Sequence, residues 1–317
     1  MSGAGPGISG RARGECMYKK HYGFKETPFN LTPNSKFFYA SAKHTEAIST
    51  LVYAIRERKG FVVITGDIGS GKTTICRTLL NQLDTNTEVV LVTNTHISGK
   101  DLLTTILDDL DIEYVPGSKA KLLSQLNYYL IEQLRSDRNI VLILDEAQNL
   151  AASVLEEVRM LSNLETENEK LIQIIFIGQP ELKKKLALAS LEQLRQRIAV
   201  FYHLVPLSYK ETHEYILHRL KIASESDRRY FTDEALELVW KYSKGVPRLV
   251  NQICDSALLT GYIAGVEEIS AEIMLEVINE SPMNQISAGT SRAIQKLDQV
   301  EHEKYERESL NIKIPEI

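Results

Sequence analysis

The chain of 317 residues is long enough for about two domains and for a core that folds without disulfides or a structural metal. Hydrophobic residues make up 43% and charged residues 25% of the chain, which excludes collagen-like, low-complexity and largely disordered proteins. The net charge of −5 does not indicate a protein that coats nucleic acid, although a local basic face is compatible with it.

The beginning of the chain predicts no targeting or anchoring segment. Residues 1–16 are rich in glycine and lack the apolar run of a secretory signal, so we expect a disordered leader, with Met17 as the natural start. No apolar run approaches the roughly 18 residues of a membrane span. The cysteines are Cys16, Cys76 and Cys254, which form neither a disulfide ladder nor a CxxC metal site. We therefore expect a cytoplasmic protein, with any contact to the inner membrane made peripherally through partners.

Residues 50–205 carry the pattern of one α/β domain. Short runs rich in Val, Ile and Leu alternate with segments that carry helical signals, which is typical of parallel strands with helical crossovers. The expected strands are Gly60–Thr65, Glu88–Thr93, Ile140–Leu144, Leu171–Ile177 and Val200–Val205. The patterns Ser98–Asp101 and Ser153–Glu156 fit the capping box that begins a helix.

Residues 206–282 predict a small domain made only of helices, because the strand signal ends at Pro206. Another capping box, Ser208–Glu211, begins the first of these helices, and Thr232 and Ser270 are expected caps. Pro247 suits the first position of a helix. The remaining residues, 283–317, form a polar tail with helical character, either solvated or bound to a partner.

A glycine-rich loop between the first strand and the next helix has the pattern G-x-x-x-x-G-K-T. Glycines let successive backbone N–H groups point at phosphate oxygens, and the helix N-terminus adds partial positive charge. Lys72 is expected to reach the β- and γ-phosphates of ATP, and the Thr73 hydroxyl to bind Mg²⁺. The predicted phosphate-binding residues are Gly66, Asp67, Ile68, Gly69, Ser70, Gly71, Lys72, Thr73 and Thr74.

Two carboxylates follow the third predicted strand, Ile140–Leu144. Acidic side chains are tolerated at the end of a buried strand where a ligand meets them. Asp145 is expected to hold the Mg²⁺ shell, and Glu146 to orient the attacking water as a general base. The pair also occurs in helicases, but a helicase needs a second nucleotide-binding domain for which this chain has no room.

Polar residues further along the chain complete the candidate site. Gln179 follows the fourth strand and is expected to contact the γ-phosphate or the attacking water. Arg195 and Arg197 precede the fifth strand, and Arg248 begins a helix after Pro247. Arginine makes permanently charged, bidentate contacts that suit a developing phosphoryl charge. The run Lys183–Lys185 is either solvated surface or a contact to DNA.

The order of these motifs resembles the AAA+ superfamily, and more narrowly the ExeA (general secretion pathway protein A) group, which is related to the MuB and TniB transposition ATPases. The opening of the chain resembles the ExeA group as well. The matching residues there are Tyr22–Phe24, Thr27–Phe29, Pro33, Phe38, Tyr39 and His44, and further on Asp145–Leu150. The resemblance implies a five-stranded parallel sheet with flanking helices, followed by a helical lid, and a linker at 17–49 whose residues 24–39 lie near adenine.

The same resemblance implies roles for the polar residues. Gln179 would be sensor 1, where many AAA+ proteins carry Asn, and Arg248 would be sensor 2. Arg195 or Arg197 would be an arginine finger that acts on the ATP of a neighbouring subunit, which requires a homo-oligomer. The longer members carry a membrane span and a peptidoglycan-binding region, and we expect neither in this chain.

Three functions remain open from the sequence. The first is a Mg²⁺-dependent ATPase whose oligomerisation and lid closure serve assembly or regulation of an envelope-associated machine for secretion, pilus formation or polysaccharide export. The second is an ATP-dependent DNA-binding regulator of the transposition type. The third is an ATP-gated scaffold with negligible turnover.

Overall fold

The computed structural model describes residues 18–281, except 33, 168, 225 and 227, so the predicted leader and tail lie outside the described residues. The chain divides into two compact units that interleave in sequence. One comprises Asn30–Ile222 and Lys244–Leu249, and is called the sheet unit below. The other comprises the described residues up to Phe29, then Ala223–Ser243, then the described residues from Val250 onward, and is called the helical unit. The domain bounds expected from the sequence stay predictions.

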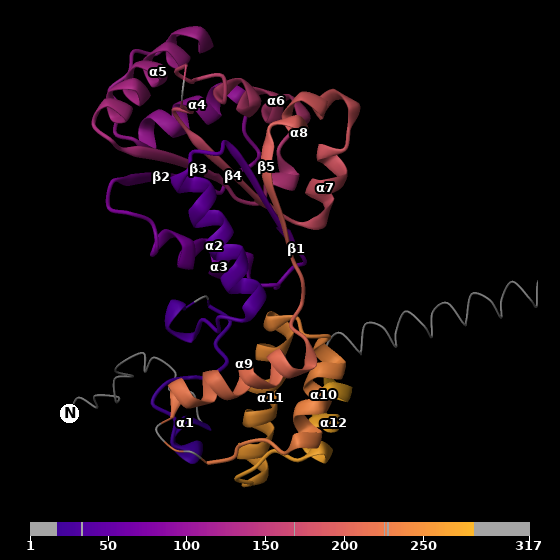
Figure 1. Ribbon diagram of the computed structural model, residues 1–317. Helices are drawn as coiled ribbons and strands as arrows, with labels where there is room; N and C mark the ends of the chain where they lie inside the picture. The colour runs from indigo at the N-terminus through magenta and orange to yellow at the C-terminus, as the bar shows by residue number, and fades with distance from the viewer. Residues whose placement is uncertain (1–17, 33, 168, 225, 227, 282–317) are drawn as a thin grey trace, which may run out of the picture. The chain divides into compact units, whose positions relative to one another are not determined.

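The sheet unit is built on a five-stranded sheet in the order β2-β3-β4-β1-β5 (Figure 1). All neighbouring strands pair in parallel, so their carboxyl ends meet at one edge of the sheet. The strands are β1 Phe61–Gly66, β2 Thr87–Val92, β3 Asn139–Leu144, β4 Gln173–Gly178 and β5 Ile198–Leu204. Each lies within about two residues of the range expected from the sequence. The central strands β1, β3 and β4 are buried on both faces, whereas the edge strands β2 and β5 are partly exposed. The predicted α/β fold is therefore confirmed.

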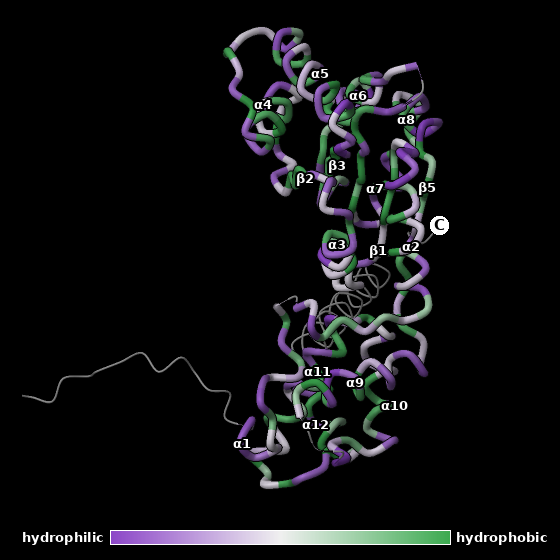
Figure 2. The backbone as a smooth tube through the Cα atoms, turned by 60° about the vertical axis from the view of Figure 1, so that its left-hand side comes forward, coloured by the Kyte–Doolittle hydropathy of each residue, from purple (hydrophilic) through white to green (hydrophobic). Residues whose placement is uncertain are grey.

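Helices cover both faces of the sheet, and alternate strand residues face the two layers (Figure 1). Val62 and Ile64 pack with α2 and α3, whereas Phe61 and Val63 pack with the opposite layer. The first layer is α2 Ala42–Arg56 and α3 Lys72–Leu80. The second is α4 Gly99–Asp109, α5 Lys119–Arg135, α6 Ala152–Leu161, α7 Pro180–Leu186 and α8 Glu192–Gln196. The largely green trace of β3 in Figure 2 reflects burial on both faces.

Helix caps follow the sequence at most of the expected positions. The Ser98–Asp101 box is present with both of its hydrogen bonds, and Ser208 and Glu211 bond reciprocally at the start of α9, Tyr209–Ala223. The Ser153–Glu156 box is wrong: α6 begins at Ala152, and its N-cap, Ala151, makes no side-chain cap bond. Ser153 lies within the first turn, two residues after the N-cap position.

The helical unit contains α1 Tyr18–Tyr22, α10 Asp233–Ser243, most of α11 Pro247–Ala264, and α12 Ala271–Glu280. The Thr232 and Ser270 caps are confirmed, because their hydroxyls accept from backbone N–H groups in the first turns of α10 and α12. Tyr22 and Phe24 pack on Tyr230, with ring centroids 6.1 and 4.8 Å apart. Among the described residues, every helix is too short or too polar to cross a membrane.

Candidate functional site

The glycine-rich loop connects β1 to α3 at the carboxyl edge of the sheet. Ser70 N–H donates to the Asp67 carbonyl over 3.1 Å, which tightens the loop. Gly69 and Gly71 have φ values of 80° and 101°, a region that side chains with a Cβ rarely adopt. α3 begins directly at Lys72, so the N–H groups of its first turn are available at the loop. The predicted strand–loop–helix arrangement is present.

Lys72 folds back over this loop. Its Nζ donates to the Gly66 carbonyl over 2.7 Å and to the Asp67 carbonyl over 2.9 Å, and the residue is only 8% exposed. Burial lowers the pKa of Lys72, and the charges of Glu146 and Asp145 oppose that shift. The ammonium therefore lies within electrostatic reach of both acids.

Ser70 is a buried polar group of the loop that lacks a protein partner. Its Oγ is buried and has no hydrogen-bond partner among the described residues. A Cβ on Gly66 would lie 2.7 Å from that oxygen, so the glycine leaves room for the hydroxyl. An orphaned buried hydroxyl in a glycine-rich loop before a helix indicates a ligand or ordered water at this place.

Asp145 and Glu146 follow β3, next to β4 in the sheet. The Asp145 N–H donates to the Val92 carbonyl over 3.0 Å, and its Oδ1 accepts from Glu146 N–H over 2.8 Å. Burial raises the pKa of Asp145, the Glu146 charge adds to that rise, and Lys72 opposes it. Glu146 has a φ of 48°, which for a residue other than glycine marks a strained position of the kind found at functional sites.

Two side-chain amides hold the Glu146 carboxylate. Gln179 Nε2 donates to Glu146 Oε2 over 3.3 Å, which brings the residue predicted as a sensor to the predicted base. Gln148 Nε2 donates to the same oxygen over 2.6 Å, and Gln148 Oε1 accepts from the Gln179 backbone N–H over 3.0 Å. Sequence reasoning missed Gln148 as a site residue; its place two residues after the acid pair was the available signal.

Arg248 also lies at the loop. Its backbone N–H donates to the Gly69 carbonyl over 3.2 Å, and a Cβ on Gly69 would lie only 2.6 Å from Arg248 Cβ. The approach is set by Gly245, with a φ of 76°, whose carbonyl accepts from Leu207 N–H over 2.9 Å. The backbone of the Gly245–Arg248 motif thus reaches the phosphate-loop candidate within the sheet unit.

The structure separates the two candidate finger arginines. Arg197 Nη1 donates to Ser162 Oγ and to Asn163 Oδ1, each over 2.6 Å, at the end of α6. Arg195 Nη1 makes one longer bond of 3.3 Å, to the Leu186 carbonyl. Both residues are exposed, but Arg197 is already held by its own chain.

His44 extends the site toward the segment before α2. Its Nδ1 lies 2.7 Å from Ser41 Oγ, and its Nε2 would lie 3.6 Å from a Cβ on Gly71. Burial lowers the pKa of His44, although the charge of Glu211 opposes the shift, so the neutral ring is favoured. The N-terminal segment of the sheet unit therefore contacts the glycine-rich loop directly.

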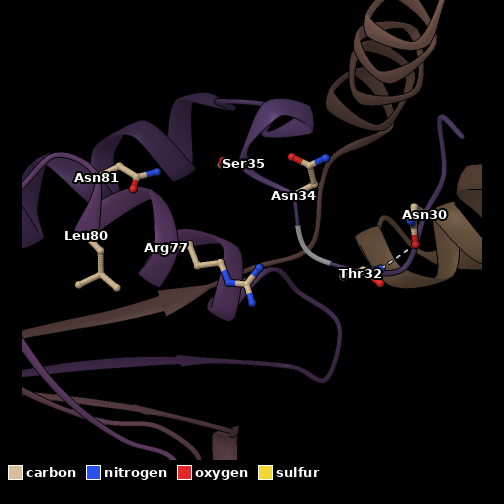
Figure 3. A pocket seen from close by; sticks show the side chains of 7 residues that line it. All are labelled: Asn30, Thr32, Asn34, Ser35, Arg77, Leu80 and Asn81. Atoms are coloured by element: carbon tan, nitrogen blue, oxygen red, sulfur yellow. Dashed lines mark hydrogen bonds between the residues drawn. The ribbon is translucent and has the colours of Figure 1, made fainter. Parts of the chain in front are cut away.

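A polar pocket of 430 Å³ lies at the far end of α3 from Lys72 (Figure 3). The segment before α2 and the last turn of α3 form its walls, and in Figure 3 the Arg77 side chain extends from α3 toward that segment. The lining residues are Asn30, Thr32, Asn34, Ser35, Arg77, Leu80 and Asn81. None of the predicted site residues lines this pocket.

Two further observations concern charge. Lys185 Nζ donates to the Gln148 carbonyl, and to the Leu150 carbonyl over 2.7 Å, so one member of the Lys183–Lys185 run faces the protein. No group of at least three His, Cys, Asp or Glu side chains is arranged for a metal within the described part of the chain. Thr73 and Asp145 nevertheless offer the oxygen ligands that Mg²⁺ takes when phosphates and waters complete its shell.

The sequence of the chain matches known proteins. The AAA domain family matches residues 55–186. Over 254 residues, or 80% of this chain, the sequence is 41% identical to General secretion pathway protein A of Aeromonas hydrophila. That match covers 46% of the relative, so this chain spans about half its length.

Solved structures show the same fold at low sequence identity. The Aeropyrum pernix ORC2 protein in its ADP form superposes with a TM-score of 0.60 at 14% identity, covering 81% of this chain and 73% of that chain. The RuvB Holliday junction branch migration motor of Thermotoga maritima gives a TM-score of 0.53 at 18% identity, covering 79% and 73%. The predicted architecture, a parallel five-stranded sheet with a helical region after it, is confirmed at the level of fold.

Proposed function

Because this chain is an AAA+ protein of the group that includes General secretion pathway protein A, we propose that it binds Mg²⁺-ATP and hydrolyses it to ADP and phosphate. One observation carries the proposal: the Glu146 carboxylate, held by the Gln179 amide, lies within electrostatic reach of the lysine of the glycine-rich loop. A phosphate cradle and a placed general base in one site are the requirements of hydrolysis.

The loop binds the phosphates. Its backbone N–H groups and the N-terminus of α3 supply donors and partial positive charge, and Ser70 Oγ is a donor that lacks a protein acceptor. Lys72 Nζ exchanges its bonds to the Gly66 and Asp67 carbonyls for phosphate oxygens, which bring a stronger, charge-assisted contact. The Arg248 side chain acts as a second cation at the γ-phosphate, since its backbone is bonded to the same loop.

Thr73 and Asp145 hold Mg²⁺, which neutralises charge on the phosphates when it is bound. Glu146 accepts a proton from the attacking water while the water oxygen forms a bond to the γ-phosphorus. The bond from that phosphorus to the β,γ-bridging oxygen breaks, and its electron pair stays on ADP. Gln179 keeps the Glu146 carboxylate at the edge of the sheet during this step.

The segment before α2 places the nucleoside. His44 lies beside the glycine-rich loop. The pocket in Figure 3 lies between the same segment and the last turn of α3. We assign the base to the side of the site formed by this segment. Assembly into a homo-oligomer brings a finger arginine to the ATP of the neighbouring subunit, and nucleotide-dependent assembly acts on an envelope-associated secretion, pilus or export machine.

The test is the isosteric substitution Glu146→Gln. It removes the proton acceptor but keeps the shape and the loop, so ATP binding stays within about threefold while phosphate release falls at least about 100-fold. The variant also accumulates the ATP-bound assembled form, which analytical ultracentrifugation measures. Glu192→Gln, at an exposed site in α8, is the matched control. ATP turnover at the wild-type rate in Glu146→Gln would overturn the mechanism. If the wild-type protein itself does not hydrolyse ATP, the result favours an ATP-gated scaffold.

A further inference from the structure

We infer that Gln148 is a positioning residue for Glu146, and that it couples the general base to the end of β4; this inference rests on the proposed ATPase function. Gln148 lies in the 3-10 turn Ala147–Asn149 that follows the acid pair. It is half-buried, and its one amide group serves two different elements.

The chemistry of the two bonds fixes the residue type. The Gln148 NH₂ faces a carboxylate oxygen at 2.6 Å, and its carbonyl faces the Gln179 N–H at 3.0 Å. The reverse amide orientation would put oxygen against oxygen and N–H against N–H, so the hydrogen-bond network determines the assignment. Only a group with a donor and an acceptor on one planar head makes both contacts.

The same hydrogen bonds determine which oxygen of the Glu146 carboxylate is free to accept a proton from water. The amides of Gln148 and Gln179 both donate to Glu146 Oε2. That oxygen is thereby committed to the protein, and Oε1 is the one that accepts the proton of water. Two donors on one oxygen also stop the carboxylate from rotating about its terminal torsion, which is otherwise broad. Gln148 therefore orients the base and does not itself touch the reacting atoms.

Neighbouring residues make room for the Gln148 side chain and hold its backbone in place. A Cβ on Gly178 would lie 2.8 Å from Gln148 Oε1, so the last residue of β4 leaves space for this amide. Lys185 of α7 binds the Gln148 and Leu150 carbonyls and holds the turn against the helix that follows Gln179. A shift at the end of β4 or in α7 thus moves the Glu146 carboxylate through Gln148.

The experiment compares Gln148→Leu, Gln148→Glu and the exposed-neighbour control Asn149→Ala in phosphate release and nucleotide binding. Leucine removes both bonds, so kcat falls about 10–100-fold while KM and ATP affinity change less than about twofold. At neutral pH the carboxylate of Gln148→Glu repels Glu146 and gives a similar loss. As the pH falls, the protonated carboxylic acid supplies both a donor and an acceptor, so its kcat rises relative to wild type.

That pH-dependent rescue distinguishes positioning from a structural role, because a packing defect has no reason to recover with acid. A constant ratio of Gln148→Glu to wild-type kcat between about pH 5 and 8 would overturn the inference. So would wild-type kcat in Gln148→Leu, or a parallel loss of ATP affinity. If wild-type protein hydrolyses ATP and Glu146→Gln does not, these outcomes refute the role of Gln148 alone. Lack of turnover in the wild type refutes the proposed function and this inference with it.

Discussion

Asp145 and Lys72 illustrate how far single residues could be read from the sequence. Their types and spacing predicted opposite charges at one edge of the sheet, and the structure places them within electrostatic reach. Gln148 could not be predicted in the same way. An amide two residues after an acid pair has many possible partners, and its contact with Gln179 joins positions 31 apart in the chain.

The burial of Asp145 predicts a conflict between stability and function. Burial raises the pKa of this carboxyl, so its charged form is less stable in the folded protein than in the unfolded chain. Asp145→Asn removes that penalty at pH 7, where the carboxylate is ionised in the unfolded chain. We expect a Tm about 2–4 °C higher in the absence of nucleotide, together with loss of Mg²⁺-dependent turnover.

The sign of the pH dependence follows from the same shift. Wild-type Asp145 takes up its proton as the pH falls, and the penalty disappears, so the difference in Tm between the two proteins shrinks toward acid pH. Differential scanning calorimetry at several pH values measures it. Glu192→Gln, which neutralises an exposed carboxylate, controls for the change in net charge. A lower Tm for Asp145→Asn at pH 7 would contradict the prediction.

At the scale of elements, the hydrophobic pattern predicted every strand of the sheet, because apolar runs are bounded by polar turns. The signal is strongest in β1, β3 and β4, which are buried on both faces, and weaker in the partly exposed edge strands β2 and β5. The sequence predicted the side-chain caps at Ser98, Ser208, Thr232 and Ser270, but it missed those of Ser41 at α2 and Ser118 at α5. The Ser153 box failed because the pattern is present but the helix starts earlier, at Ala152. A capping-box pattern identifies residues that are able to cap a helix, but it does not determine at which residue the packed helix begins.

The turn at Gly245 places the start of α11 beside the glycine-rich loop, and a substitution there tests this arrangement. With a φ of 76°, an alanine here is strained, and its Cβ would lie 1.9 Å from the Leu207 carbonyl oxygen. Gly245→Ala should therefore lower the free energy of unfolding by about 2–5 kcal/mol and weaken ATP binding, since Arg248 loses its place at Gly69.

Gly60→Ala is the matched control for Gly245→Ala. Gly60 also has a positive φ, 91°, but a Cβ there meets no atom within 4 Å. It should cost only the backbone strain, about 1–2 kcal/mol, and leave ATP affinity unchanged. Urea unfolding and nucleotide titration measure both quantities. Equal losses in the two variants would show that the close approach to Leu207 has no energetic consequence.

At the scale of the whole molecule, the sequence predicted assembly through an arginine finger, but it did not decide which arginine is the finger. Two arginines precede β5, and periodicity gave no reason to prefer one. The structure favours Arg195 as the finger, because Arg197 already donates to Ser162 and Asn163. That preference depends on the end of α6, a segment more than thirty residues upstream.

We therefore expect the two alanine variants to differ. Arg195→Ala should lower phosphate release at least about 100-fold with ATP binding intact. Arg197→Ala should keep most of its turnover but unfold at a lower temperature, because the buried Ser162 hydroxyl and the exposed Asn163 amide oxygen lose their donor. Mixing Arg195→Ala with Lys72→Ala subunits should restore part of the activity if the finger acts on a neighbour. Full activity in Arg195→Ala, or no recovery in the mixture, would contradict the assignment.

The strand order has a consequence for synthesis of the chain. β1 carries the glycine-rich loop but pairs only with β4 and β5, both far downstream. While the ribosome makes the chain from Gly66 to Leu204, at about 5–20 residues per second, β1 waits roughly 7–28 s for its second neighbour. During that time the hydrogen-bonding edges of β1 lack one or both of their partner strands, so we expect the strand that leads into the glycine-rich loop to complete its pairing late in synthesis.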